Sequence, residues 1–121
     1  MTLEQQVTSL ELSKKLKELG VKQDSLFWWL EVSPGQWNTH CLSYGKREEN
    51  IGISAFTVSE LGEILPEYFC SAQAGTQEKW VCEKYSHGTI DAEVPRLYAD
   101  TEANARAKML IYLIEHKLIT L

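Results

Sequence analysis

The chain is poor in the features that mark several protein classes. Its 121 residues include three prolines and seven glycines and no low-complexity tract, so a long disordered tail is not expected. No apolar run approaches the ~20 residues that span a membrane. The first residues are polar and acidic, whereas a signal peptide begins with basic residues and an apolar stretch. We therefore expect a cytoplasmic protein that does not bind membranes.

Cysteine and basic side chains are also scarce. Cys41, Cys70 and Cys82 are odd in number and lack a CxxC spacing, which indicates reduced thiols. Twelve Lys and Arg stand against 17 Asp and Glu, giving a formal net charge of −5. Nonspecific nucleic-acid binding needs a concentrated basic surface and is not expected. Residues 1–121, 44% of them hydrophobic, are expected to form one globular domain.

What is present begins with a well-marked helix. Thr8 and Glu11 have the spacing of a capping box, in which each side chain bonds the other residue's backbone amide. Val7 and Leu12 stand where the two ends of a hydrophobic staple would be. Gly20 is placed to end the helix in a left-handed conformation. The pattern predicts a short amphipathic helix that is capped at both ends.

Two further helices are predicted. Thr57 and Glu60 repeat the capping box, and Pro66 ends that helix. The last helix is expected over residues 101–119, capped by Asp100 or Thr101. Its apolar stripe consists of Ala103, Ala107, Leu110, Ile114 and Leu118. Because this helix is apolar nearly all round, we expect it either to be the central core helix or to meet a partner chain.

The remaining patterns are those of strands. A hairpin is predicted, with a type II turn at residues 33–36 between its two strands. Short glycine-containing loops between the later strands favour antiparallel pairing. The five predicted strands cover residues 26–32, 37–44, 67–73, 79–85 and 89–94. The order αββαβββα predicts an α+β fold, with a mostly antiparallel sheet of about five strands and two or three packed helices.

Three blocks of the sequence resemble a known group of proteins. They are LKELGVKQDSLFWW, ISAFTVSELGEILP and DTEANARAKMLIYLIEHKLI. This combination is similar to small hypothetical proteins of bacteria and their phages or prophages, and it covers roughly half of the chain. The resemblance implies a bacterial or phage setting and a cytoplasmic location. That group has no established activity, so no catalytic or binding residues are implied.

Motifs for catalysis, metals and cofactors are missing. The three histidines and three cysteines match neither a zinc ribbon nor an HExxH helix. No GxSxG, GxxxxGK[ST] or GxGxxG is found. The predicted helix N-termini at Thr57 and Thr101 could hold an anion, but their own caps use those amides. We therefore predict a protein that is not an enzyme and that holds no metal or cofactor.

Aromatic and apolar side chains give the leading functional hypothesis, which is a small protein-interaction module. Its partner-binding surface is predicted around Phe27 and Trp29, or on the last helix near Met109, Tyr112 and Leu113. Self-association through one of these surfaces, giving a homodimer, is a subsidiary prediction. An alternative is a small-ligand binder or enzyme whose site is assembled from dispersed residues. Candidates for that site are His40, Cys82, Tyr85 and His87. A pocket with converging polar groups would favour the alternative.

Overall fold

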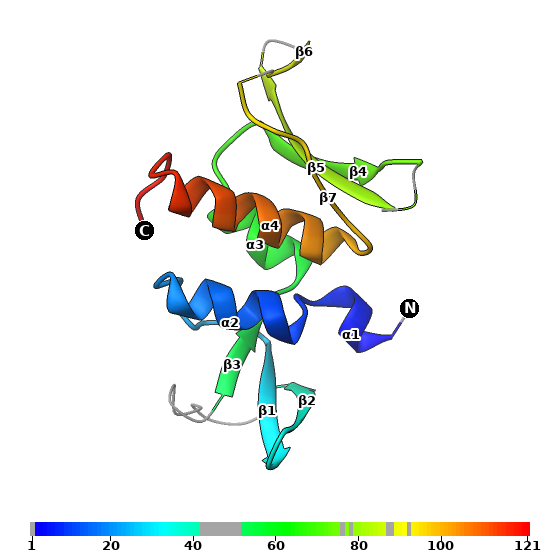
Figure 1. Cartoon of the computed structure of the whole chain (residues 1–121), viewed down its shortest axis with the longest axis vertical. Coiled ribbons are helices and arrows are strands. Elements are labelled where there is room, and N and C mark those ends of the chain that lie inside the picture. Colours follow the sequence, from blue (N-terminus) through cyan, green and yellow to red (C-terminus); the bar gives the residue numbers. More distant parts are fainter. Residues whose placement is uncertain (1, 42–51, 76, 78, 87–88, 92) are drawn as a thin grey trace.

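Helices lie between two small sheets that occupy opposite ends of the molecule (Figure 1). The structure is a computed structural model and describes residues 2–41, 52–75, 77, 79–86, 89–91 and 93–121. Its helices are α1 (Leu3–Gln6), α2 (Leu10–Glu18), α3 (Val58–Ile64) and α4 (Glu102–Glu115). Its strands are β1 (Phe27–Ser33), β2 (Gln36–Cys41), β3 (Gly52–Ala55), β4 (Phe69–Gln73), β5 (Trp80–Ser86), β6 (Thr89–Ile90) and β7 (Leu97–Ala99).

The strands form two separate antiparallel sheets. The first has the order β2-β1-β3, so β1 is its central strand. In the second, β5 pairs with β4, β6 and β7. The α+β class and the antiparallel pairing are confirmed, whereas the single sheet of about five strands is replaced by two. The sequence did not predict β3, because its residues are all buried and show no alternation.

The predicted strand at residues 89–94 is shorter than expected. It ends at Ile90, and the Val94 N–H donates to the carbonyl of Asp91 in a turn, at 3.3 Å. The chain then returns to the same sheet as β7, which pairs Leu97 with Cys82 and Ala99 with Trp80. Residues 45–50 (GKREEN), a charged stretch for which the sequence predicts a loop, lie outside the described residues.

The start of α2 differs from the prediction by one residue. Ser9 is the N-cap, and its hydroxyl accepts from the Leu12 N–H at 3.3 Å. The predicted Thr8–Glu11 capping box is wrong, because the Thr8 hydroxyl is buried and accepts from the backbone N–H of Phe56 at 3.0 Å. The predicted termination at Gly20 is confirmed by its φ of +92°. The short helix α1, which precedes these residues, was not predicted.

Helix α3 begins and ends as predicted. Thr57 is its N-cap, and the Glu60 carboxylate accepts from the Thr57 N–H while the Thr57 hydroxyl accepts from the Glu60 N–H. Pro66 follows the C-cap residue Leu65. Phe56 and Leu61 have the spacing of a hydrophobic staple around this N-cap, and both are buried in the same hydrophobic cluster.

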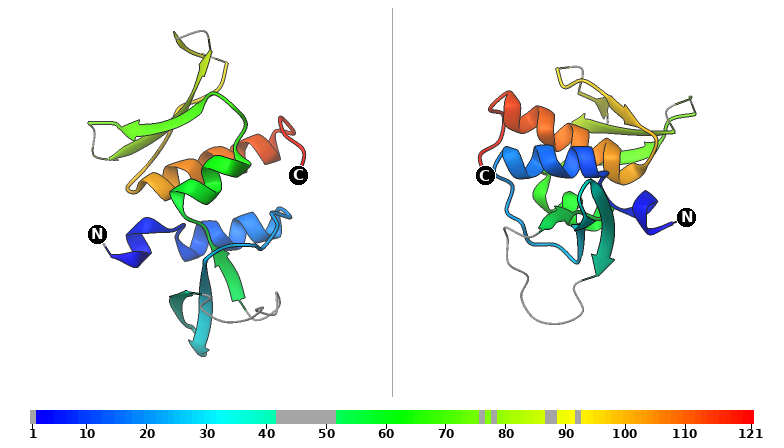
Figure 2. Two further views of the ribbon diagram at one scale, coloured as in Figure 1. Left: turned by 180° about the vertical axis from the view of Figure 1, so that it is seen from behind. Right: turned by 60° about the horizontal axis from the view of Figure 1, so that its bottom comes forward.

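Helix α4 is the central element. It contacts β4, β5 and β7 on one side and α2 and α3 on the other, and Figure 2 shows α3 and α4 side by side from behind. The prediction that this helix is buried on more than one side is therefore confirmed. Its N-cap is Thr101, whose hydroxyl accepts from the Asn104 N–H. The helix ends at Glu115, several residues before the predicted end.

The core has two parts. The larger cluster surrounds α4 and includes Leu16, Phe56, Leu61 and Cys82 together with the inward side of that helix. The smaller cluster lies under the first sheet. Its buried members are Val7, Trp29, Ile53 and Ala55. Each sheet therefore has a hydrophobic cluster of its own on the side that faces the helices.

Candidate functional site

The first predicted interaction surface lies mostly inside the molecule. Trp29 is 9% exposed, and its indole N–H donates to the Thr8 carbonyl at 2.9 Å. Phe27 is half-buried and packs against the same cluster. This burial follows from the fold, because β1 is the central strand and the chain around α1 packs on it. Trp29 is therefore not offered to a partner in this conformation.

The second predicted surface is also largely covered. Met109 and Leu113 on α4 are buried in the larger cluster. Tyr112 is half-buried, and its ring stacks on His116 with 4.0 Å between the ring centroids. Of these three residues, Tyr112 exposes the most to solvent.

The residues of the alternative site do not converge where they are described. Cys82 faces α4 and is fully buried, and burial raises the pKa of its thiol to about 12. Tyr85 lies three residues further along β5 and therefore on the opposite face. There its hydroxyl donates to the Glu83 carboxylate at 2.9 Å, a bond that raises the pKa of Tyr85. His87 and the side chain of His40 lie outside the described part of the structure.

A groove of about 500 Å³ lies at the C-terminal end of α4. Its apolar lining comes from the chain before β4, the turn after β6, and the end of α4 with the residues beyond it. We call it the C-terminal groove, and its apolar residues are Pro66, Tyr68, Phe69, Val94, Leu113, Leu118 and Ile119. Tyr68 is 67% exposed and Leu118 is 57% exposed. Large exposed apolar side chains grouped in this way mark interaction surfaces more often than isolated ones do.

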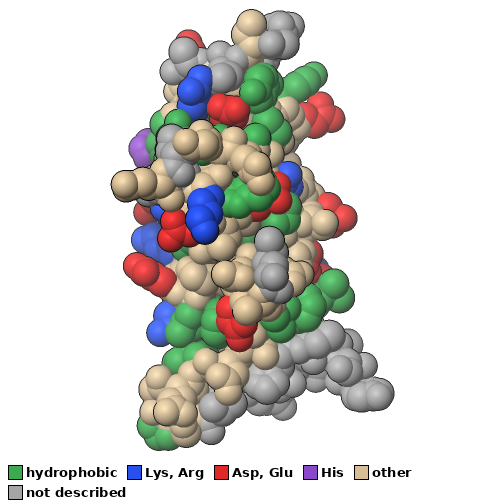
Figure 3. All heavy atoms as spheres, turned by 90° about the vertical axis from the view of Figure 1, so that its right-hand side faces the viewer, with side chains coloured by type: hydrophobic (Ala, Val, Ile, Leu, Met, Phe, Trp, Pro, Cys, Tyr) green, Lys and Arg blue, Asp and Glu red, His purple; other side chains and the backbone are tan. Residues whose placement is uncertain are grey.

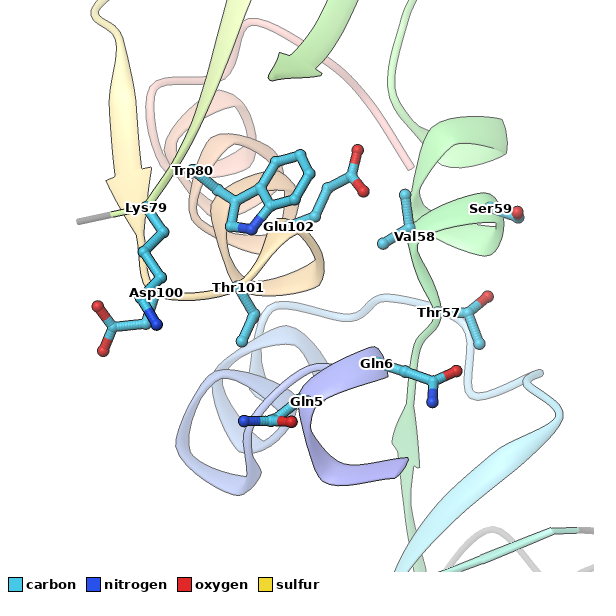
Figure 4. A pocket seen from close by; sticks show the side chains of 10 residues that line it. All are labelled: Gln5, Gln6, Thr57, Val58, Ser59, Lys79, Trp80, Asp100, Thr101 and Glu102. Atoms are coloured by element: carbon cyan, nitrogen blue, oxygen red, sulfur yellow. The ribbon is translucent and has the colours of Figure 1, made fainter. Parts of the chain in front are cut away.

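A second hollow of about 450 Å³ lies at the other end of α4 (Figure 4). We call it the N-terminal pocket. It is lined by Gln5 and Gln6 from α1, the first residues of α3, the start of β5, and the turn from β7 into α4. Its lining residues are Gln5, Gln6, Thr57, Val58, Ser59, Lys79, Trp80, Asp100, Thr101 and Glu102. Figure 3 shows the side of the molecule that carries α1, where apolar, acidic and basic side chains are mixed.

Comparisons of the chain with protein-family models, with curated proteins and with solved structures find no match. In the part of the chain that the structure describes, no helix has both the length and the apolar character to cross a membrane. Over the same residues, no three His, Cys, Asp or Glu side chains are grouped as metal ligands would be.

The C-terminal groove has an acidic rim. Glu67, Asp91 and Glu93 line it together with one basic residue, Lys84. The Lys84 Nζ lies 3.4 Å from the Asp91 carboxylate. The Asp91 carboxylate also accepts from the Glu93 backbone N–H at 3.0 Å, and this bond is the main reason that the pKa of Asp91 is lowered. With Lys84 paired to Asp91, the remaining charge on the rim is negative.

Tyr68 has an unusual backbone. Its φ of +74° lies in the left-handed region, which is unfavourable for a bulky residue. The conformation directs the Tyr68 carbonyl to accept from the Tyr85 N–H at 2.8 Å, which joins the start of β4 to β5. Glycine would adopt this conformation without strain. The strained position is therefore occupied by an aromatic side chain that is mostly exposed at the groove.

In the N-terminal pocket, the Glu102 carboxylate is held in place by neighbouring side chains. The Ser71 hydroxyl on β4 donates to Glu102 Oε2 at 2.5 Å. Arg106, one turn further along α4, donates from Nε to the Ser71 Oγ at 2.8 Å and from Nη1 to the Val58 carbonyl at 3.0 Å. A Cβ at Gly62 would collide with the Arg106 guanidinium, so this glycine leaves room for it.

Neither hollow was predicted from the sequence. The exposed residues of the C-terminal groove lie in turns and beyond a helix end, where no periodic pattern exists. For the N-terminal pocket, one signal was available: Glu102 and Arg106 are four residues apart on a predicted helix and so lie on one face. Nothing in the sequence placed Ser71 between them.

Proposed function

We propose that this protein is a small cytoplasmic binding module, without catalytic activity, that holds a short segment of another protein in the C-terminal groove. The observation that carries the proposal is the grouping of exposed Tyr68 and Leu118 around an apolar floor with an acidic rim. The leading interaction hypothesis from the sequence is kept, and its surface moves from Phe27 and Trp29 to this groove. Leu113, one of the predicted residues, forms part of the floor.

The partner segment carries one or two apolar side chains flanked by Lys or Arg. The apolar side chains would cover Leu118 and the floor, since burying apolar area gives about 25 cal/mol per Å². The basic residues would lie against Glu67 and Glu93, and opposite charges across an interface also speed association. A contact of this size belongs to the weak, transient class of interfaces, so we expect a Kd of about 1 μM or weaker.

Charge disfavours a second copy of the chain as the occupant. Two grooves that face each other would bring two acidic rims together, in a protein whose net charge is already −5. Like charges placed opposite each other across an interface oppose binding. Homodimerisation is therefore an outcome that the test must exclude.

Two further considerations support this assignment. The sequence blocks that resemble small bacterial and phage proteins suggest a bacterial or phage origin, in which a binding module would act on a protein of the host or of the phage. The pKa values of the Cys70 and Cys82 thiols are raised, mainly by burial. Both thiols are then protonated at neutral pH, whereas a nucleophilic cysteine must form a thiolate.

The test is selection of binders from a library of random 12-residue peptides, followed by titration of the best peptides against purified variants. We expect the selected peptides to combine aliphatic or aromatic residues with Lys or Arg. Leu118→Ser and Glu93→Lys should each weaken binding about tenfold, as the loss of one buried contact of about 1.4 kcal/mol would do. The matched controls are Leu26→Ser and Glu63→Lys. They change an exposed leucine and an exposed glutamate that lie outside the groove, so the Kd should stay unchanged.

Tyr68→Gly separates binding from stability. It removes the exposed ring and also relieves the left-handed strain, so stability should stay constant or rise by about 1 kcal/mol while the peptide is lost. Peptides without basic residues, or equal loss of binding in the controls, would contradict the proposal. A dimer in analytical ultracentrifugation that Leu118→Ser dissociates would replace the peptide with a second copy.

A further inference from the structure

We propose that the N-terminal pocket binds a small organic cation, namely an amine or guanidinium on a short alkyl stem. The site is separate from the C-terminal groove, because the two lie at opposite ends of α4 and share no lining residue. The inference therefore does not depend on the proposed peptide binding. It rests on three features of the pocket: a fixed carboxylate, an apolar wall and the balance of charge.

The fixed carboxylate is that of Glu102. One of its oxygens, Oε2, accepts from the Ser71 hydroxyl, which in turn accepts from Arg106. The other oxygen has no hydrogen-bond partner among the described residues, and Glu102 lines the pocket. A carboxylate whose orientation is already set loses little entropy when it accepts a ligand N–H, so it is preorganised for binding.

The apolar wall is formed by Trp80 and Val58. The Trp80 side chain enters from β5 and the Val58 side chain from α3, while Gln5 and Gln6 approach from α1 (Figure 4). Trp80 is half-buried, so part of its ring surface is accessible. Indole is the aromatic group that attracts cations most strongly, over distances up to about 6 Å from the ring. A short alkyl stem beside the cation would also bury apolar area against Val58.

The charges of the lining favour a cation over an anion. Asp100 and Glu102 are acidic and Lys79 is basic, which leaves one net negative charge. Arg106 is already bonded to Ser71 and to the Val58 carbonyl. The N-termini of α3 and α4 face this region and would attract an anion, but their cap residues Thr57 and Thr101 are bonded within their own helices. An anion would also be repelled by Glu102 in the first turn.

The size of the pocket limits the ligand. A volume of about 450 Å³ is near the lower end of the range of roughly 300–1,000 Å³ that small-molecule sites occupy. Such a space accommodates a stem of a few carbons with one charged head. A large flat cofactor would not be enclosed.

The test uses n-butylguanidinium and n-butylamine as probes and n-butanol as their neutral counterpart. Each is titrated into ¹⁵N-labelled protein, and the indole N–H signal of Trp80, assigned from its absence in Trp80→Phe, is followed. Both cations should shift this signal with saturation, and n-butanol should not. Glu102→Gln should raise the Kd at least tenfold. Trp80→Leu, which keeps the charge but lacks the indole signal, is followed through the backbone amide signal of Glu102 and should raise the Kd several-fold.

Two controls keep the result specific. Glu63→Gln removes an acidic charge outside the pocket and should leave the Kd unchanged. Glu102 also stabilises the positive end of α4, so each variant is first shown to be folded by its spectrum and melting temperature. Equal binding of n-butanol, an unchanged Kd in Glu102→Gln, or no shift of the Trp80 signal by either cation at 10 mM would each overturn the proposal.

Discussion

Thr8 joins three parts of the molecule through its polar atoms. Its backbone N–H donates to the Phe56 carbonyl, and its hydroxyl accepts from the Phe56 N–H. The same hydroxyl lies 2.6 Å from the Ser13 hydroxyl on α2, and the Thr8 carbonyl accepts from the Trp29 indole. All of these atoms are in the protein interior, where a lost partner is costly. Thr8 therefore links α2, the first sheet and the segment that leads into α3.

Thr8→Val tests this network. Valine has nearly the same shape but leaves the Phe56 N–H without its partner, and it leaves the Ser13 hydroxyl with only the Thr8 carbonyl, at 3.3 Å. The free energy of unfolding should therefore fall by about 2–3 kcal/mol. Ser54→Ala is the matched control, because the Ser54 hydroxyl is buried and has no hydrogen-bond partner in the described residues. That variant should be neutral or stabilising by up to about 1 kcal/mol. Urea unfolding of both measures the difference, and equal losses would contradict the assignment.

Cys82 makes the free energy of unfolding fall as the pH rises above the usual pKa of a thiol. Burial raises the pKa of its thiol from 9.0 to about 12, so the folded state keeps a proton that the unfolded chain releases. The contribution is complete below the unfolded pKa and is lost as pH rises toward the folded value. Between pH 9 and 11 this lowers the free energy of unfolding by about 1.4 kcal/mol per pH unit. Cys82→Ala should show a shallower slope in urea unfolding across that range, and parallel slopes would contradict the prediction.

At the scale of elements, two helices end with the same motif but with different residues. In α2 the Val21 N–H donates to the Leu16 carbonyl, and Gly20 has a φ of +92°. After α4 the Leu118 N–H donates to the Leu113 carbonyl, and the left-handed residue is Lys117 with a φ of +56°. A side chain in this conformation costs roughly 1–2 kcal/mol relative to the right-handed one.

Lys117→Gly should therefore stabilise the protein. The expected gain is about 1 kcal/mol, because glycine adopts the left-handed conformation without a Cβ penalty. Gly20→Ala should lose a similar amount, and nothing lies within 4 Å of the Cβ that it adds, so the cause would be the backbone alone. Thermal and urea unfolding measure both variants. A loss of stability in Lys117→Gly would show that the lysine side chain matters more than its backbone.

These two helix ends show what the sequence could predict. Gly20 and Pro66 are residue types that favour the end of a helix, since glycine adopts positive φ without strain and proline cannot continue a helix. The helix ends beside these two residues were predicted correctly. Lys117 carries no such signal, and the last helix was therefore predicted to continue to residue 119. The C-terminal groove could not be predicted for the same reason. Tyr68 and Leu118 are exposed because the backbone turns beside them, and neither Tyr nor Leu is a residue type that indicates a turn.

At the scale of the whole molecule, the two sheets are unequally supported. The sheet of β4, β5 and β7 packs on α4, which contributes seven buried residues to the larger cluster. The sheet of β1–β3 rests on the smaller cluster around Val7 and Trp29. Regions with less buried apolar contact open with smaller free energies. The prediction of a single sheet was wrong because the pairing of strands depends on how the helices separate them in space. Short-range sequence patterns do not contain that information.

Hydrogen exchange tests the unequal support. We expect the amides of β1 and β3 to open with a free energy lower by at least about 1 kcal/mol than those in the middle of α4. The measurement is native-state amide exchange at increasing urea concentration. Equal protection throughout would show that the network at Thr8 couples both sheets into one cooperative unit.

The position of α4 in the chain has a consequence for synthesis. Every other described helix and strand precedes it, yet it fills the centre of the larger cluster, and its Asn104 accepts from the backbone N–H of Ser9 across 95 positions of sequence. While the ribosome is still making residues 102–115, the finished strands β4, β5 and β7 lack the helix that covers them. Closure of the core must wait until α4 has left the exit tunnel. Until then, the apolar faces of β4, β5 and β7 are exposed to chaperones and to other nascent chains.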